Sequence, residues 1–375
     1  MLLAIGESSL VACCARKSAR RSCRRDAVGW GLGFYGPPFY LHAVHESRGW
    51  SLNVVSTAVT VHFLFGAIVI ANLPRLYRRS GLARVTKAGS LALAIGVAGW
   101  ALAQEPWQLF VATLFNGGGW VTMGAAAVNA IVAPWFVRKR PAALASAYNG
   151  SSIGGFVFSP LWVAAIGLLG FPSAAIAIGV VVVATIWILA DLYYSKTPES
   201  MGLRPDGDAP HAAATTLPMS SPAKPLPSTR VWRDWRLLTL AAGMALGLFA
   251  QIGLLAHLFS LLVPALGAQL AGFAAGGATA SAILGRTLVG WLTPTGDFSD
   301  APITPCRFWA RSPSCSRQAT TSTYAFAPAV FGLIRELAPR WGSASAGAAP
   351  WLFLAAALIQ ILAVVVFFIG RPRKA

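Results

Sequence analysis

One arginine stands inside a stretch that is otherwise apolar. Arg286 lies in SAILGRTLVGW, six residues before the end of an apolar run at 270–292. A guanidinium at such depth is costly in hydrocarbon, so it normally faces a bundle interior or a water-filled cavity. There it could bind a carboxylate through two parallel hydrogen bonds. The alternative is a structural role, in which the side chain reaches the membrane surface or pairs with the end of a helix.

Uncharged polar side chains within other apolar stretches form a second group of candidates. Each could hydrogen-bond a passing solute, and each could equally bond a neighbouring helix. A histidine in such a place could also carry a proton. We expect substrate-binding residues to be among Arg286, Tyr35, Asn149, Tyr148, Asn116, Gln251 and His257.

The sequence lacks the motifs on which catalysis and cofactor binding commonly rest. It contains no G-x-x-x-x-G-K-[ST], no G-x-S-x-G and no H-E-x-x-H. Its 12 acidic residues all lie outside the middle of the apolar stretches, so no buried carboxylate is available for a proton relay. We therefore expect no catalytic residues, no cofactor and no metal. A membrane-bound enzyme or structural subunit is the weaker alternative.

The composition is that of a chain whose solvent is mainly lipid. Of the 375 residues, 56% are apolar and 11% are charged, whereas soluble domains carry about 25% charged residues. The apolar residues come in runs close to the length of about 20 residues that crosses a bilayer. We predict an all-α integral membrane protein with ten spans, near 27–44, 52–73, 88–103, 107–132, 142–169, 172–194, 237–262, 270–292, 319–335 and 350–369.

Basic residues cluster in alternate links between these spans. If the N-terminus is cytoplasmic, nearly all of the 30 Lys and Arg residues fall on the cytoplasmic side, as the positive-inside rule requires. The net charge of +18 is then a topology signal with some affinity for anionic lipid, and we exclude a nucleic-acid partner. Both chain ends are predicted to be cytoplasmic.

The predicted organisation has two halves. Residues 27–194 form a six-helix bundle, residues 195–236 a linker too rich in Pro, Ser, Ala and Thr to fold alone, and residues 237–371 a second, incomplete bundle. Glycines four apart, such as Gly272 and Gly276, predict close helix packing. The stretch GLGFYGPP predicts an interrupted first helix, which either lines a substrate path or is a kink with a packing role.

Four stretches resemble the major facilitator superfamily, and within it the bacterial monocarboxylate and oxalate/formate carriers. They are GLGFYGPPFYLHAVHESRGWS, NLPRLYRRSGLARV, APWFVRKRPAALASAYNGSSIGG and GRTLVGWL. The resemblance implies two pseudo-symmetric six-helix bundles, a central cavity and alternating access by rocking. It also implies that Arg286 binds anions. The carboxylate that often accompanies this arginine is missing, and Arg78 stands about where the family usually has Asp.

The resemblance implies 12 transmembrane helices, and we recognise about 10. Helices nine and ten have no counterpart before TYAFAPAVFGLIREL, because the polar segment 293–323 stands in their place. Residues 1–26 are equally unlike the family. We hypothesise that both segments are translated out of frame; zinc binding or a disulfide is the alternative, although the spacings do not suit a metal. These segments hold all five cysteines, Cys13, Cys14, Cys23, Cys306 and Cys315.

We therefore expect a secondary active transporter of small organic solutes in the bacterial inner membrane, working by symport or antiport. Monocarboxylate-type anions are the candidate substrates, a proton is the candidate coupling ion, and the lipid bilayer is a partner. The alternatives are an impaired remnant of such a transporter and a drug or metabolite exporter.

Overall fold

The computed structural model describes residues 27–136, 140–194, 235–292, 326–338 and 348–369. The described part contains helices and no strand, which confirms the predicted all-α fold. After a helical segment at 27–33, the elements are α2 (Pro37–Arg48), α3 (Leu52–Ser80), α4 (Leu82–Leu102), α5 (Pro106–Val121), α6 (Ala125–Val132), α7 (Arg140–Leu169), α8 (Phe171–Leu189), η1 (Ala190–Tyr194), α10 (Trp235–Leu292), α13 (Ala327–Leu337) and α14 (Ala349–Ile369).

Every predicted span contains a helix, and six described helices are long and apolar enough to cross a bilayer. One of them is α10, which bends at Gly267 (φ 73°) into a first arm, 235–266, and a second arm, 268–292. The segments 1–26 and 293–323 lie outside the described residues. So does the predicted linker 195–236, except for its last two positions, which begin α10.

The first helix is interrupted at Phe34–Gly36, as GLGFYGPP predicts. Pro37 and Pro38 have no N–H, so the carbonyls of Gly33 and Phe34, four residues earlier, lose their helical partners. The Leu32 carbonyl accepts a hydrogen bond of 3.1 Å from the fully buried Tyr40 hydroxyl. A methyl group on Gly36 would stand 2.2 Å from the Leu32 oxygen and 2.3 Å from that hydroxyl, so glycine is required there.

A second interruption divides the stretch 107–132, which the sequence predicts as one span. Helix α5 ends at Val121, α6 begins at Ala125, and the three residues between them are not helical. The Thr122 carbonyl at this break accepts a hydrogen bond of 3.1 Å from the Tyr77 hydroxyl of α3. The predicted span 107–132 thus contains two helices, and the hydrogen bond from Tyr77 supports the break between them.

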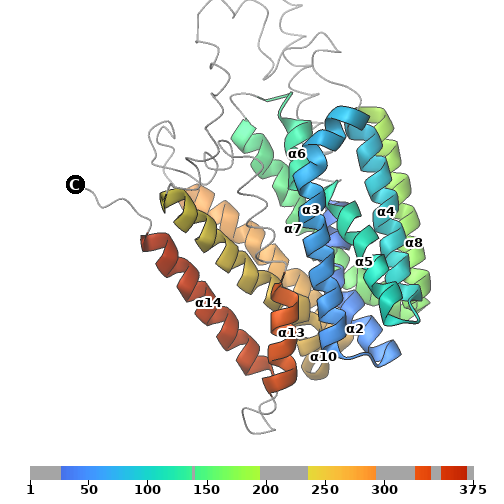
Figure 1. Cartoon of the computed structure of the whole chain (residues 1–375), viewed down its shortest axis with the longest axis vertical. Helices are drawn as coiled ribbons and strands as arrows, with labels where there is room; N and C mark the ends of the chain where they lie inside the picture. The colour runs from blue at the N-terminus through green and yellow to red at the C-terminus, as the bar shows by residue number, and fades with distance from the viewer. Residues whose placement is uncertain (1–26, 137–139, 195–234, 293–325, 339–347, 370–375) are drawn as a thin grey trace, which may run out of the picture.

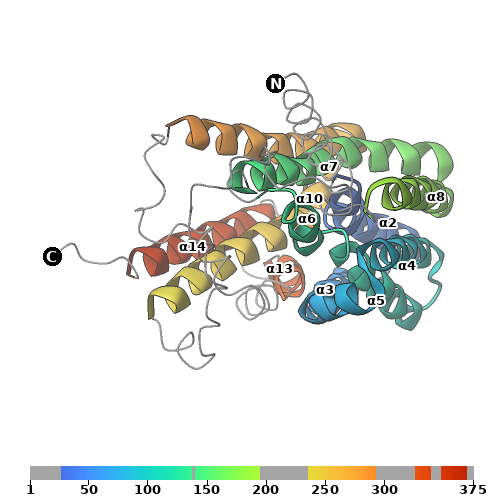
Figure 2. The same ribbon diagram turned by 90° about the horizontal axis from the view of Figure 1, so that it is seen from above.

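The helices form two groups that meet at one end (Figure 1). The first group contains residues 27–33, α2–α8 and η1, and the second contains α10, α13 and α14. Seen from above in Figure 2, the second arm of α10 lies along α7, and the first arm lies along α14. Gly272 makes the first of these contacts possible, because a methyl group there would come within 2.8 Å of Val163.

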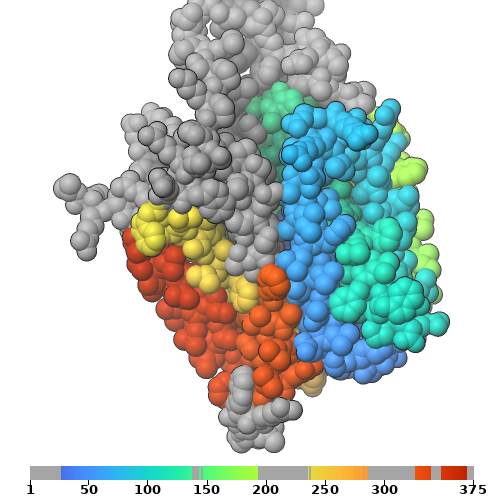
Figure 3. Space-filling model, viewed as in Figure 1, coloured from blue at the N-terminus to red at the C-terminus, as the bar shows by residue number. Residues whose placement is uncertain are grey.

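We call the contact of α13 and the first arm of α10 with α3 and α2 the seam. Figure 3 shows α13 lying directly against α3. Two backbone N–H groups donate hydrogen bonds across it: Asn53 to the Glu336 carboxylate (2.8 Å) and Ala329 to the Thr60 hydroxyl (3.2 Å). Away from the seam the two groups diverge (Figure 1).

The substitution Tyr40→Phe tests the account of the first break. It removes the donor to the buried Leu32 carbonyl, and an unsatisfied buried acceptor costs about 1–3 kcal/mol. We expect the free energy of unfolding in detergent to fall by that amount. Tyr77→Phe, whose bond is only partly buried, should cost less because water can replace the hydroxyl. A Tyr40→Phe protein as stable as the unsubstituted chain would contradict this account.

The substitution Gly332→Val tests the seam. A methyl group at Gly332 would stand 2.7 Å from the Ser56 hydroxyl oxygen, so a larger side chain should hold α13 away from α3. We expect hydrogen exchange of the Asn53 and Ala329 amides to become faster. Gly277→Val is the matched control, because nothing lies within 4 Å of a methyl group there. Unchanged exchange at both amides in Gly332→Val would refute a seam that depends on this close approach.

Candidate substrate-binding site

A cavity of about 410 Å³ lies between the interrupted first helix and the second helix group. The break contributes Tyr35, both arms of α10 contribute side chains, and α14 supplies the remaining wall. The lining is mainly leucine, alanine and phenylalanine. Its polar members are Tyr35, Gln251, Thr279 and Gln360.

These polar groups leave hydrogen-bonding capacity inside the cavity. The Gln360 amide donates to the Gly247 carbonyl (3.1 Å), and the Thr279 hydroxyl donates to the Gly276 carbonyl (2.7 Å). Their oxygen atoms can still accept hydrogen bonds. Gln251 is exposed within the lining and can offer both a donor and an acceptor. An apolar wall with a few polar groups is the usual make-up of a small-molecule site.

The cavity is closed toward the seam by apolar packing. Leu255 lines both the cavity and a gap of only about 10 Å³ beyond it. That gap is bordered by Phe34, Pro37, Val59 and other apolar side chains of both helix groups. The gap has room for about one water molecule, so a solute in the cavity cannot pass the seam in this conformation.

The sequence-predicted residues fall into several environments, and two of them, Tyr35 and Gln251, meet in the cavity. Position 286 lies in the second arm of α10, seven residues after Thr279. Seven residues are about two helical turns, or about 10.5 Å, so the two backbone positions share a face of the arm. The side chain of Arg286 is outside the described part of the structure.

The other predicted residues lie away from the cavity lining. Asn116 and His257 are fully buried. The His257 Nε2 lies 3.1 Å from the Pro328 carbonyl, which joins α10 to α13. Tyr148 accepts a hydrogen bond of 2.7 Å from Asn129, which joins α6 to α7, and Asn149 is half-buried in α7. The described hydrogen bonds of His257 and Tyr148 are thus between helices, whereas the buried Asn116 amide has no described hydrogen-bond partner.

Sequence reasoning missed two lining residues, Thr279 and Gln360. Gln360 is the only polar residue in the stretch ALIQILAVVVFFI of α14, so the criterion that selected Gln251 could have found it. Thr279 carries a weaker signal, because threonine is common in transmembrane helices. Thr279 precedes position 286 by seven residues and so shares a helix face with it, and this spacing was the available signal.

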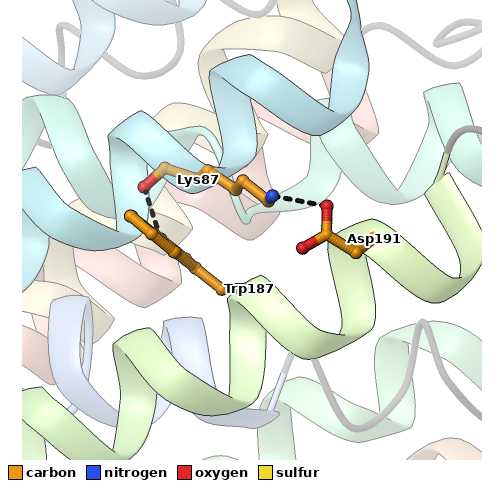
Figure 4. Close-up of polar contacts among 3 residues, drawn as sticks. All are labelled: Lys87, Trp187 and Asp191. Carbon is orange, nitrogen blue, oxygen red and sulfur yellow. Dashed lines mark hydrogen bonds and ion pairs between the residues drawn. The ribbon is translucent and has the colours of Figure 1, made fainter.

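A charged cluster lies apart from the cavity, where α4 meets the end of α8 (Figure 4). Lys87 forms an ion pair with Asp191 and lies 5.5 Å from the centre of the Trp187 ring. The Trp187 indole N–H donates to the Lys87 carbonyl over 3.3 Å. The Asp191 side chain is 66% exposed, so the pair contributes at most about 1 kcal/mol. The three residues join α4 to α8 and η1, so the cluster contributes to the packing of these elements.

Several solved structures of transporters are similar to this chain. A bacterial homologue of the human lysosomal transporter Spinster, in an inward-facing and occupied conformation, superposes with a TM-score of 0.56 at 14% identity, covering 94% of this chain and 80% of that one. A mutant of the nucleoside transporter NupG superposes with a TM-score of 0.62 at 11% identity, covering 96% of this chain and 100% of that one. The peptide transporter POT in complex with sulfate superposes with a TM-score of 0.60 at 14% identity, covering 94% of each chain. At these identities the likeness shows the fold alone.

Sequence comparison supplies the family. No curated protein sequence matches the chain significantly. The profile of the Major Facilitator Superfamily matches residues 27–309, which is more than half of the chain. With its apolar helices and its transporter fold, the chain belongs to the major facilitator superfamily and is a multi-pass membrane protein.

Proposed function

We propose that this protein is a secondary active transporter of small organic solutes that works by alternating access, with monocarboxylate-type anions as its substrate class. The observation that carries the proposal is the cavity between two helix groups, walled on one side by a broken helix and closed at one end by the seam. A solute bound there contacts both groups, so it can favour one relative orientation of the groups over another.

Alternating access requires the seam to open while the diverging end closes. Two hydrogen bonds and the apolar packing around Leu255 must break at the seam. On the positive-inside rule we propose that the seam lies on the outer face of the bacterial inner membrane and that both chain ends lie in the cytoplasm. We propose a proton as the coupling ion, exchanged at a group outside the described cavity lining, which contains no carboxylate.

The choice of anions rests on Arg286. Its backbone position continues the cavity face of the second arm, two turns beyond Thr279. A guanidinium there would pair with a carboxylate while Tyr35 and Gln251 hydrogen-bond the rest of the solute. The likeness to monocarboxylate carriers supports the same role.

A neutral drug or metabolite is the second candidate substrate. The described cavity lining carries no charged side chain, and most of it is leucine, alanine and phenylalanine. Such a wall binds an uncharged, partly apolar solute without the cost of desolvating an ion.

The substitution Arg286→Ala separates the two substrate classes. We expect uptake of labelled pyruvate into proteoliposomes to fall by about tenfold or more, because a charge-assisted carboxylate contact is worth about 1.5–3 kcal/mol. Transport of a neutral solute should persist. Arg84→Ala removes an exposed charge from the start of α4 and should leave uptake unchanged. Full pyruvate uptake by Arg286→Ala would refute carboxylate recognition, and no uptake by the unsubstituted chain would indicate an impaired remnant.

The substitution Gln251→Leu tests the cavity itself. It keeps the size of the side chain and removes both hydrogen-bonding groups, so we expect the KM of a transported solute to rise about threefold to tenfold. Asn72→Leu is the control, because that amide is half-buried on α3 and its described hydrogen bond goes to the Ile68 carbonyl of its own helix. Equal KM values for Gln251→Leu and the unsubstituted protein would place the binding site elsewhere.

A further inference from the structure

A second arginine, Arg335, lies at the seam, in the last turn of α13. Its side chain is half-buried, and its guanidinium donates hydrogen bonds to the Ser260 hydroxyl and, over 3.4 Å, to the Ser260 carbonyl. Both acceptors belong to α10. The arginine therefore does not cap the free carbonyls at the end of its own helix, which is the usual structural role of a cation in that position.

No carboxylate neutralises Arg335 within the described residues. The ion pair found among the described residues joins Lys87 and Asp191, in a distant part of the first helix group. Glu336, the next residue along α13, instead accepts from the Asn53 amide at the start of α3. Glu46, on α2, is exposed at the same end and makes no described ion pair. A half-buried guanidinium without a counter-charge is costly, so its retention at this place needs a reason.

The surroundings of Arg335 face the opposite helix group. Next to its partner Ser260, the ring of Phe259 packs on Phe39 (4.6 Å between ring centres) and His42 (5.1 Å), both from α2. The charge of Arg335 acts weakly on His42 and on His257, and the Glu46 carboxylate acts on His42 more strongly than Arg335 does. Neither histidine supplies negative charge. In the proposed transport cycle α2 and α3 move away from α13 when the seam opens, and the Arg335 guanidinium then faces the entrance.

We infer that Arg335 is a carboxylate-recognition residue at the seam end, which binds the anion when the two helix groups separate there. The inference rests on the proposed function. Ser260 engages one edge of the guanidinium, and the remaining N–H groups have no described partner. They can form two parallel hydrogen bonds to a carboxylate. With the seam closed, the same arginine adds to the contact between α13 and α10.

Transport kinetics in vesicles with the seam end outside test this role. For Arg335→Gln we expect the KM of external labelled pyruvate to rise about tenfold or more, with the maximal rate within about twofold of the unsubstituted value. Arg335→Lys keeps the charge without the planar pair of donors, so its KM should lie between those of Arg335→Gln and the unsubstituted chain. Arg48→Gln, at the exposed end of α2, is the matched control and should leave the KM unchanged. An unchanged KM in Arg335→Gln, or a lower maximal rate alone, would overturn the inference.

Chemical protection of the unsubstituted chain decides the matter if Arg335→Gln does not fold. Phenylglyoxal modifies accessible guanidinium groups, and mass spectrometry gives the extent of modification at Arg335 in proteoliposomes. We expect saturating pyruvate to protect Arg335 and pyruvamide, which lacks the carboxylate, to leave it reactive. Equal modification in the two solutions would overturn the inference.

The two experiments also separate this inference from the proposed function. Protection of Arg335 without any pyruvate uptake would support an anion site at the seam and refute carboxylate transport. Saturable pyruvate uptake without protection would leave carboxylate transport standing and overturn the role of Arg335.

Discussion

A backbone polar group in hydrocarbon has no water to bond, and this constraint shapes the molecule around its broken first helix. Pro37 and Pro38 cannot continue the helical hydrogen bonds, so the chain at Phe34–Gly36 needs support from side chains. Tyr40 reaches back to Leu32 from a buried position among the rings of Trp162, Phe171 and Trp100. That support lets the backbone turn within the membrane and places Tyr35 in the cavity wall.

The break and the seam have different structural roles. The break supplies a non-helical segment beside the cavity, where a solute can meet polar groups. The seam holds the two helix groups together at one end with few bonds: two cross-group hydrogen bonds, aromatic contacts of Phe259 and the close approach of Gly332 to Ser56. An interface of this kind can separate at modest cost, whereas the close contact of α10 with α7 keeps the groups joined.

Much of the fold followed from the length and spacing of apolar runs, because bilayer thickness fixes how long a spanning helix must be. The interruption of the first helix was also predictable, since two prolines and a glycine act locally. The break between α5 and α6 was not predicted, and the described side chain that supports it, Tyr77, lies 45 residues away from Thr122 in the chain. Contacts of that kind have no local signature.

The candidate site was predictable only in part. A polar residue in an apolar helix faces either a cavity or another helix, and sequence alone does not say which. Gln251 lines the cavity, whereas Asn116 is buried and His257 bonds the Pro328 carbonyl. The difference arises from helix rotation, which packing against distant neighbours sets. The proposed domain boundaries and the absence of helices nine and ten remain predictions, since residues 293–325 lie outside the described part of the chain.

The central claim is that the two helix groups rock around the cavity as a solute crosses. Distances between spin-label pairs in lipid nanodiscs test it directly, with one pair at the seam end (Ser47 and Leu333) and one at the diverging end (Arg79 and Trp235), all exposed positions. We predict that conditions which lengthen the Ser47–Leu333 distance shorten the Arg79–Trp235 distance. A transported solute should change the distributions of both distances together. Two fixed distances, or two that change in the same sense, would contradict the account.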